Sequence, residues 1–231
     1  MTTRHLMKAL SPARSKYRGS SILLLLTTTL TYAQTSLGHL GNYTNPEERI
    51  FLEKYQNAWE FMAQFTPMHL LKRNFNTDPL NRNVTACVSA ITTFVNNDTF
   101  EVQQNISYFN TSHCSWFSFW KNFTASMSRE NGTVRNKFLS TDKSSSNDTL
   151  VYPVIFADED CLITRLTHRS NDTYKACELW VRDSYFERNT SFHTCCDFIF
   201  DFFCSPATQV LYNRTQCEEL RNDNFGMINM N

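Results

Sequence analysis

Cys177-Glu178-Leu179-Trp180 sets a cysteine, a carboxylate, an aliphatic side chain and an indole at consecutive positions. Alternate side chains of a strand face opposite ways, so a strand here would place Glu178 and Trp180 on one face and Cys177 and Leu179 on the other. An acid beside an aromatic ring on the inner wall of a sheet is typical of a small-molecule pocket and attracts cations. Taken alone, the four residues favour the simpler alternative of a solvated Glu178 and a core Trp180.

The region around this stretch has the pattern of a β-meander. From about residue 65, short runs rich in β-branched and aromatic residues alternate with clusters of Asn, Asp, Ser and Thr. Eight such runs without long helices between them favour an antiparallel sheet that closes into a barrel, because closure removes the free strand edges. A barrel of this size has room for side chains or for one small ligand. The predicted strands are 67–74, 86–95, 99–109, 114–123, 133–140, 149–157, 161–168 and 175–182.

Helical periodicity flanks the meander on both sides. Asn45-Pro46-Glu47-Glu48 is a helix start, and apolar residues follow at helical spacing, which predicts one amphipathic helix over 46–62. Phe192 to Cys204 has a broad apolar face and predicts a second helix. After it we expect a short strand at 209–212, then Cys217, then a loose tail to Asn231. The predicted fold class is therefore mainly β, an eight-stranded antiparallel barrel with an N-terminal and a C-terminal helix packed outside.

Residues 1–33 have the pattern of a secretory signal peptide. Five basic residues precede the apolar run Ile22–Leu30, and Thr31-Tyr32-Ala33 offers small residues for cleavage. The leader holds five of the 22 Lys and Arg residues and none of the 22 Asp and Glu residues, so residues 34–231, the expected single domain, have a net charge of −5. We expect a secreted, extracellular protein with no electrostatic attraction to nucleic acid or membrane. An uncleaved anchor is the alternative.

The eight cysteines all follow the leader. An even count in a secreted chain predicts four disulfides, and spacing alone cannot fix their pairing. No CxxC pair and no His at ligand spacing supports a metal site. The cysteines are Cys87, Cys114, Cys161, Cys177, Cys195, Cys196, Cys204 and Cys217.

Eleven N-glycosylation sequons are spread along the chain, more than composition predicts by chance. Glycans need water-exposed asparagines, so a broad protein-binding face is disfavoured while an enclosed pocket is not. The open end of the barrel stays available to a protein partner. The sequons begin at Asn42, Asn83, Asn97, Asn105, Asn110, Asn122, Asn131, Asn147, Asn171, Asn189 and Asn213.

Three groups of residues, in order and spacing, resemble the tick salivary lipocalins, the histamine-binding protein family. Tyr55-Gln56-Asn57-Ala58-Trp59 is similar to the first-helix motif of that family, with Asn57 where Asp is usual. Phe75-Asn76-Thr77-Asp78-Pro79 precedes Cys87 as in the family. Cys161, then Glu178-Leu179-Trp180, then Cys195-Cys196 resembles its later signature. The resemblance covers residues 46–217.

This resemblance implies a salivary protein that sequesters a small host mediator inside its barrel and so suppresses host defence at the feeding site. Histamine or another biogenic amine is the first expectation. A lipid mediator such as a leukotriene or fatty acid, or a decoy role toward complement or chemokines, is the alternative. Glu178, Trp180, Phe75 and Asp78 fall on positions that hold the amine in the family, and Phe75 replaces a Tyr.

Two departures weaken the resemblance to amine binders. Leu162 stands where the amine-binding signature has an Asp, and a buried ammonium without a carboxylate costs several kcal/mol. Asn81 stands where a Trp is found. The expectation is therefore either one amine site centred on Glu178, rather than two, or a change to a more apolar ligand.

The resemblance also implies disulfide pairs. Cys87 is expected to pair with Cys217, and Cys161 with Cys195 or Cys196. Cys177 with Cys204, and Cys114 with the remaining helix cysteine, are the inferred completion.

No catalytic motif is present. The sequence has no Gly-x-Ser-x-Gly, no His-Glu-x-x-His and no phosphate-binding glycine loop, and its six histidines are scattered. We therefore expect a monomeric binding protein without a cofactor, not an enzyme.

Overall fold

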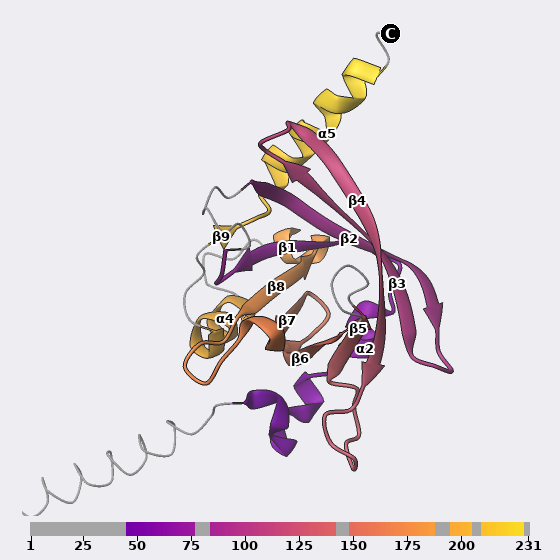
Figure 1. Cartoon of the computed structure of the whole chain (residues 1–231), viewed down its shortest axis with the longest axis vertical. Coiled ribbons are helices and arrows are strands. Elements are labelled where there is room, and N and C mark those ends of the chain that lie inside the picture. Colours follow the sequence, from indigo (N-terminus) through magenta and orange to yellow (C-terminus); the bar gives the residue numbers. More distant parts are fainter. Residues whose placement is uncertain (1–44, 77–83, 142–147, 188–194, 205–208, 229–231) are drawn as a thin grey trace, which may run out of the picture. The chain divides into compact units, whose positions relative to one another are not determined.

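The computed structural model describes residues 45–76, 84–141, 148–187, 195–204 and 209–228, and the following account concerns these alone (Figure 1). All eight predicted strands are present, within a few residues of their expected ends. They pair antiparallel in sequence order from β2 to β8, and β1 closes the barrel by pairing with both β8 and β2. The strands are β1 Met68–Arg73, β2 Thr85–Asn96, β3 Glu101–Asn110, β4 Ser115–Ser126, β5 Lys137–Thr141, β6 Thr149–Ala157, β7 Cys161–Arg165 and β8 Cys177–Arg182.

Buried side chains form two large cores and a third, smaller one around the Cys87–Cys217 disulfide. One large core lies inside the barrel and includes Met68, Val102, Phe138 and Leu162. The other large core lies between the outer face of β6, β7 and β8 and helix α4 (Cys195–Cys204), and it is centred on the fully buried Phe200. The side chains that line the inside of the barrel are therefore separate from those that pack against α4.

The prediction of a single helix over 46–62 is wrong. The segment forms two 3₁₀ turns, η1 (Pro46–Glu48) and η2 (Ile50–Tyr55), and a short helix α2 (Ala58–Met62). The break follows from Gln56, which is completely buried and whose side-chain amide donates to the carbonyls of Pro46 and Ile155. A continuous helix could not place this polar side chain against β6 with both bonds made.

A buried ion pair fixes the same segment to the barrel. Glu47 is 3% exposed and pairs with Arg165 of β7. Asn136, also buried, donates its amide to the backbone carbonyl of Glu47. These contacts compete with helical hydrogen bonding, which explains why helical periodicity in the sequence did not produce a full helix.

The prediction of a loose tail after Cys217 is also wrong. A helix, α5 (Arg214–Ile228), follows the short strand β9 (Gln209–Val210), which is all that forms of the strand predicted at 209–212. The Asn213 side chain accepts the Gln216 N–H at the start of α5, an N-cap contact that the sequence analysis overlooked. A further short helix, α3 (Asp183–Glu187), follows β8. Among the described residues, no helix combines the length and apolarity needed to cross a membrane.

Three disulfides are formed, not four. Cys87 pairs with Cys217, Cys161 with Cys196, and Cys177 with Cys204. The expected fourth pair, Cys114 with Cys195, is not formed: both cysteines are free, and both are exposed. The two neighbouring cysteines of α4 point about 100° apart around the helix. Cys196 therefore faces β7 and Cys195 faces solvent.

Removal of the Cys87–Cys217 disulfide by alanine at both positions is expected to lower the free energy of unfolding by about 3–4 kcal/mol. The bond closes a long loop, spanning 130 residues, and ties α5 to β2. Urea unfolding of the secreted protein measures the change. The Cys114→Ala and Cys195→Ala variants are the controls and should leave the unfolding midpoint unchanged. A comparable loss in either control would contradict the observed pairing.

Candidate functional site

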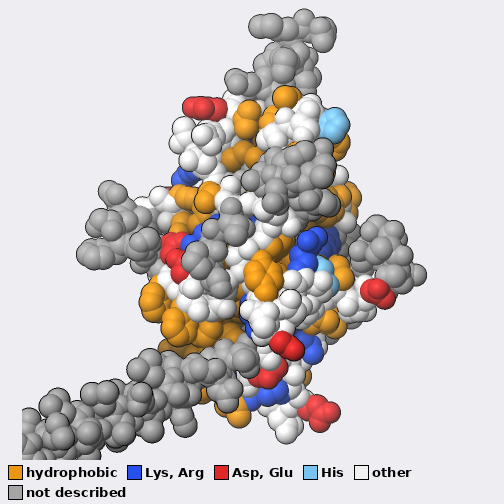
Figure 2. All heavy atoms as spheres, turned by 60° about the vertical axis from the view of Figure 1, so that its left-hand side comes forward, with side chains coloured by type: hydrophobic (Ala, Val, Ile, Leu, Met, Phe, Trp, Pro, Cys, Tyr) orange, Lys and Arg blue, Asp and Glu red, His pale blue; other side chains and the backbone are white. Residues whose placement is uncertain are grey.

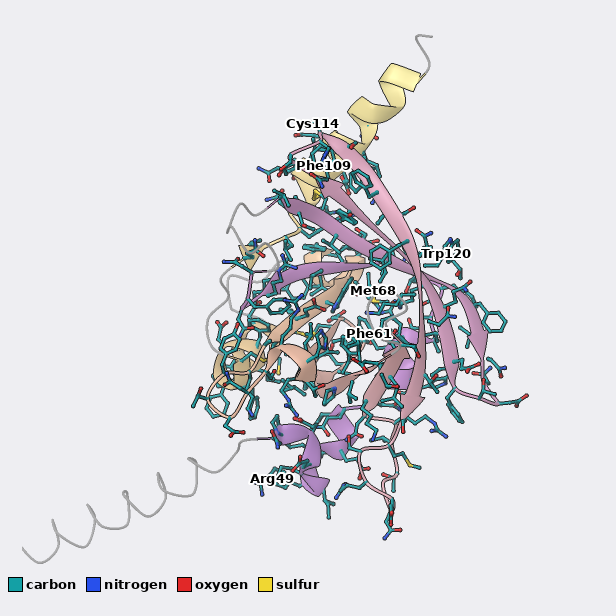
Figure 3. All side chains as sticks on the ribbon, viewed as in Figure 1. Arg49, Phe61, Met68, Phe109, Cys114 and Trp120 are labelled. Atoms are coloured by element: carbon teal, nitrogen blue, oxygen red, sulfur yellow. A yellow bond between two sulfur atoms is a disulfide. The ribbon has the colours of Figure 1, made fainter. Side chains whose placement is uncertain are left out.

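The barrel encloses a cavity of about 600 Å³. This volume lies within the range of small-molecule sites, about 300–1,000 Å³. Figure 3 shows Met68 inside the barrel, where it contributes to the apolar lining. The apolar wall is made by Met62, Met68, Leu70, Val88, Ile106, Phe123, Phe138 and Leu162.

Glu178 and Trp180 lie on the inner face of β8 and line this cavity. The Trp180 indole N–H donates to Glu178 Oε2 at 3.0 Å. Cys177 points to the other face, where it forms the disulfide with Cys204 of α4. The face assignment made from the alternation of this stretch is thus the one observed.

Burial raises the pKa of the Glu178 carboxyl above its ordinary value. The Trp180 hydrogen bond and the positive charges of Arg73, Lys121 and Arg169 act in the opposite direction, but they do not outweigh the loss of water. The environment of Glu178 therefore favours the protonated carboxyl more than water does.

Positive charge surrounds this acid. Arg73 of β1 lies directly opposite Glu178 in the strand pairing. The guanidiniums of Arg73 and Arg169 lie over the ring of Phe75, at 5.2 and 5.3 Å from its centroid. Arg73 is held there by a hydrogen bond from its Nε to the Gln209 side chain at 2.6 Å. Phe75 is therefore part of a basic side of the cavity.

Lys121 extends this basic side across the barrel. Its ammonium donates to the Tyr152 hydroxyl at 2.7 Å and lies over the rings of Phe123 and Tyr152. His168 also lines the cavity. Among the described lining residues, three permanent cations thus accompany a single carboxylate. On the face drawn in Figure 2, basic and histidine side chains lie beside hydrophobic ones near the centre.

The inward position of Arg73 does not follow from simple alternation, because a bulge changes the face of β1. The register against β8 shifts between Leu70 and Lys72. Lys72 consequently points outward to Asp197 of α4, at 2.9 Å, and Arg73 points inward. Strict alternation from Leu70 would have reversed these two positions, since a one-residue slip changes the face of every later side chain.

The other predicted positions have mixed outcomes. Leu162 of β7 pairs with Trp180 and is buried in the cavity wall, so no carboxylate is available there. Asp78 and Asn81 lie outside the described residues. The structure therefore brings together Glu178, Trp180 and Phe75.

A Ser–His–Asp arrangement lies outside the cavity. His69 Nδ1 is 2.9 Å from Ser89 Oγ, and its Nε2 is 3.1 Å from Asp183 Oδ1. Ser89 and His69 are each 6% exposed, and the His69 ring stacks on Tyr212 at 4.0 Å. Burial lowers the pKa of His69, against the opposing effect of Asp183. None of the three lines the cavity, so this cluster joins β1, β2 and α3 as a structural contact.

One cluster in the described part of the chain has the composition of a metal site. Asp158, Cys161 and Cys196 offer ligand atoms within 4.8 Å of one another. Both cysteines are in one disulfide, so neither supplies a thiolate. The cluster does not support metal binding.

A model of the tick histamine-binding protein family matches residues 46–219. This match includes the whole barrel, helix α4 and the start of α5. The chain belongs to the tick histamine-binding protein family.

Solved structures with this fold share little sequence with the chain. Japanin from Rhipicephalus appendiculatus, bound to cholesterol, is 14% identical with a TM-score of 0.47, and the match covers 67% of this chain and 97% of that one. The serotonin complex of AM182 is 15% identical with a TM-score of 0.44, covering 69% and 90%. The siderocalin Ex-FABP is 13% identical with a TM-score of 0.38, covering 68% and 85%. No curated protein sequence gives a significant match.

Replacement of Glu178 by Gln is expected to stabilise the ligand-free protein at neutral pH. Because the pKa of Glu178 is higher in the folded than in the unfolded protein, its protonation stabilises the fold. This stabilisation is fully present below about pH 4.5, the ordinary pKa of the group, and is lost as the pH rises through the folded-state pKa. Glutamine imitates the protonated acid at every pH. Thermal unfolding from pH 4 to 8 should show a gain for E178Q that grows with pH.

The exposed Glu130 provides the control, since E130Q removes the same charge from the surface. The melting temperature of E130Q should equal that of the wild type at every pH. If E178Q were less stable than the wild type at pH 7, the buried carboxylate would be serving as a favourable charge within the cavity.

Proposed function

We propose that this protein is a secreted scavenger that binds an amphipathic lipid mediator with an acidic headgroup inside its barrel, and so removes it from the host tissue at the feeding site. The observation that carries the proposal is the basic side of the cavity, formed by Arg73, Lys121 and Arg169. The predicted signal peptide and the sequons support secretion, and residues 34–231 would form the mature domain.

Electrostatics favour an anion at this position. Two unit charges 4 Å apart interact by about 4 kcal/mol at an effective dielectric constant of 20. A carboxylate beside Arg73 and Arg169 would gain charge-assisted hydrogen bonds, whereas an ammonium there would meet like charges. Burial lowers the pKa of Arg73 and Glu178 opposes this, so an anionic ligand would also compensate for the dehydration of the guanidinium.

The remaining wall suits an apolar chain. The cavity is bordered by buried apolar side chains, among them Leu70, Ile106, Phe138 and Leu162. Each Å² of apolar ligand surface removed from water contributes about 25 cal/mol before the costs of association. A hydrocarbon body with one acidic end would therefore match both sides of the cavity.

A biogenic amine is the second candidate, and Glu178 is the observation that favours it. The carboxylate lies beside the Trp180 ring, and together they could hold an ammonium by charge and by the ring face. Such a ligand would have to outweigh the neighbouring Arg73 and the absence of an acid at Leu162. We therefore rank the amine, which the sequence resemblance placed first, below the acidic lipid.

Replacement of Arg169 by Gln is expected to weaken binding of a fatty acid such as arachidonic acid about tenfold, because one charge-assisted hydrogen bond contributes about 1.5 kcal/mol. Isothermal calorimetry on the secreted protein measures the affinity. K54Q removes an exposed charge that does not line the cavity and should leave the affinity unchanged. Equal affinities for the wild type and R169Q would contradict an acidic headgroup at this side.

Titration with histamine and serotonin separates the two candidates. The proposal predicts weak amine binding by the wild type, and it predicts that E178Q keeps or improves fatty-acid affinity. Tight amine binding that E178Q abolishes would establish Glu178 as a counter-ion and would reverse the ranking. Retention of a serum protein in a pull-down, with no uptake of either small molecule, would point instead to a decoy for a host protein.

A further inference from the structure

The barrel is incompletely closed between β4 and β5. Strand β4 spans Ser115 to Ser126, but only Thr124, Ala125 and Ser126 pair with β5. The rest of β4, from Ser115 to Phe123, pairs with β3 and with no other strand among the described residues. An exposed strand edge of this length carries unpaired backbone groups and invites association with other chains.

A groove of about 820 Å³ follows this gap, between β4 and the β5–β6 pair. The rings of Phe119 and Trp120 border it, and Trp120 is 60% exposed. Figure 3 shows Trp120 on the outer side of β4. Aromatic faces beside amide and hydroxyl groups form the kind of surface that binds sugars, since a pyranose offers C–H groups to a ring and hydroxyls to polar side chains. The polar groups come from Gln103, Thr141 and Thr149.

Among the described residues, the Ser140 hydroxyl has no hydrogen-bond partner. Ser140 is 4% exposed, and its Oγ makes no hydrogen bond in the structure. A buried hydroxyl without a partner costs about 1–3 kcal/mol. The Ser140 side chain shares the buried face of β5 with Phe138, so the polar contacts of the groove come from its other lining residues.

Asn122 lies in the wall of the same groove and begins the sequon Asn122-Phe123-Thr124. Its side chain is exposed, and its Oδ1 accepts a hydrogen bond from the Gln103 amide at 3.1 Å. Its Nδ2, the atom that carries an N-glycan, donates no hydrogen bond to another described residue. Asn136, which begins no sequon, instead uses its Nδ2 to donate to the Glu47 carbonyl.

We propose that the groove is occupied by the N-glycan of Asn122, whose first sugar packs on Trp120. Trp120 and Asn122 are two positions apart on one strand, so their side chains share a face. In the secretory pathway, the Asn122 amide nitrogen would displace dolichyl pyrophosphate from the anomeric carbon of a dolichol-linked oligosaccharide. A C–N bond forms, the C–O bond to the lipid pyrophosphate breaks, and the amide loses one proton.

An attached glycan would cover the free edge of β4. The groove and the cavity share Phe119, Lys121 and Leu150, so the same glycan would also close the side of the barrel. A covalent occupant accounts for a long open edge better than a transient peptide strand, because the polar lining and the attachment point belong to the same groove. The inference is independent of which ligand the cavity binds.

The test compares N122Q with N131Q in protein secreted from insect cells, by glycopeptide mass spectrometry and amide hydrogen exchange. Asn131 is an exposed sequon outside the groove and provides the matched control. We expect Asn122 to be occupied, and exchange across Ser115–Phe123 to be several-fold faster in N122Q but unchanged in N131Q. Iodide should also quench Trp120 more strongly in N122Q, with W120F identifying its share of the fluorescence.

Two outcomes would overturn the inference. An unmodified Asn122 would do so, as would equal exchange of β4 in N122Q and N131Q. If β4 were protected in an unglycosylated protein that sediments as a dimer, a second copy of the chain would be the occupant of this edge. Because none of these measurements uses a ligand, failure of the proposed scavenging function would leave them unaffected.

Discussion

The burial of charge inside the barrel is the constraint on which the site depends. Glu178 and Arg73 face each other across β8 and β1, within a wall that is otherwise largely apolar. Neither group is solvated as in bulk water. Burial raises the pKa of Glu178 and lowers the pKa of Arg73, so it disfavours the charged form of both. Desolvation of such a pair is costly, and the proposed anionic ligand would add a favourable interaction with Arg73.

The rigid surroundings make this burial possible. Disulfides from Cys161 and Cys177 hold α4 against the outer faces of β7 and β8, while β1 is held by its pairing with β2, β8 and β9. The helix therefore holds these strands through their outer faces alone, and the side chains on their inner faces do not pack against it. The cavity can remain open because the second core, centred on Phe200, stabilises the wall from outside.

The strands were predictable because their alternation and their turn residues are local properties of the sequence. The face of Glu178 and Trp180 followed from the same alternation. The first helix was not predictable, because the buried partners of Glu47 and Gln56 come from β6 and β7, about a hundred residues away. Arg73 was missed since the bulge at Leu70–Lys72 depends on pairing with β8, and Lys121 because its partner Tyr152 lies on another strand. The absent Cys114–Cys195 bond follows from the direction in which α4 presents its two adjacent cysteines.

A crystal structure of the secreted protein with oleic acid tests the central claim most directly. The account predicts that the carboxylate lies within hydrogen-bonding distance of Arg73 or Arg169 and that the hydrocarbon chain lies along Leu70, Ile106 and Phe138. A chain inserted with its carboxylate in solvent, or a cavity that excludes the fatty acid and admits an amine on Glu178, would contradict it.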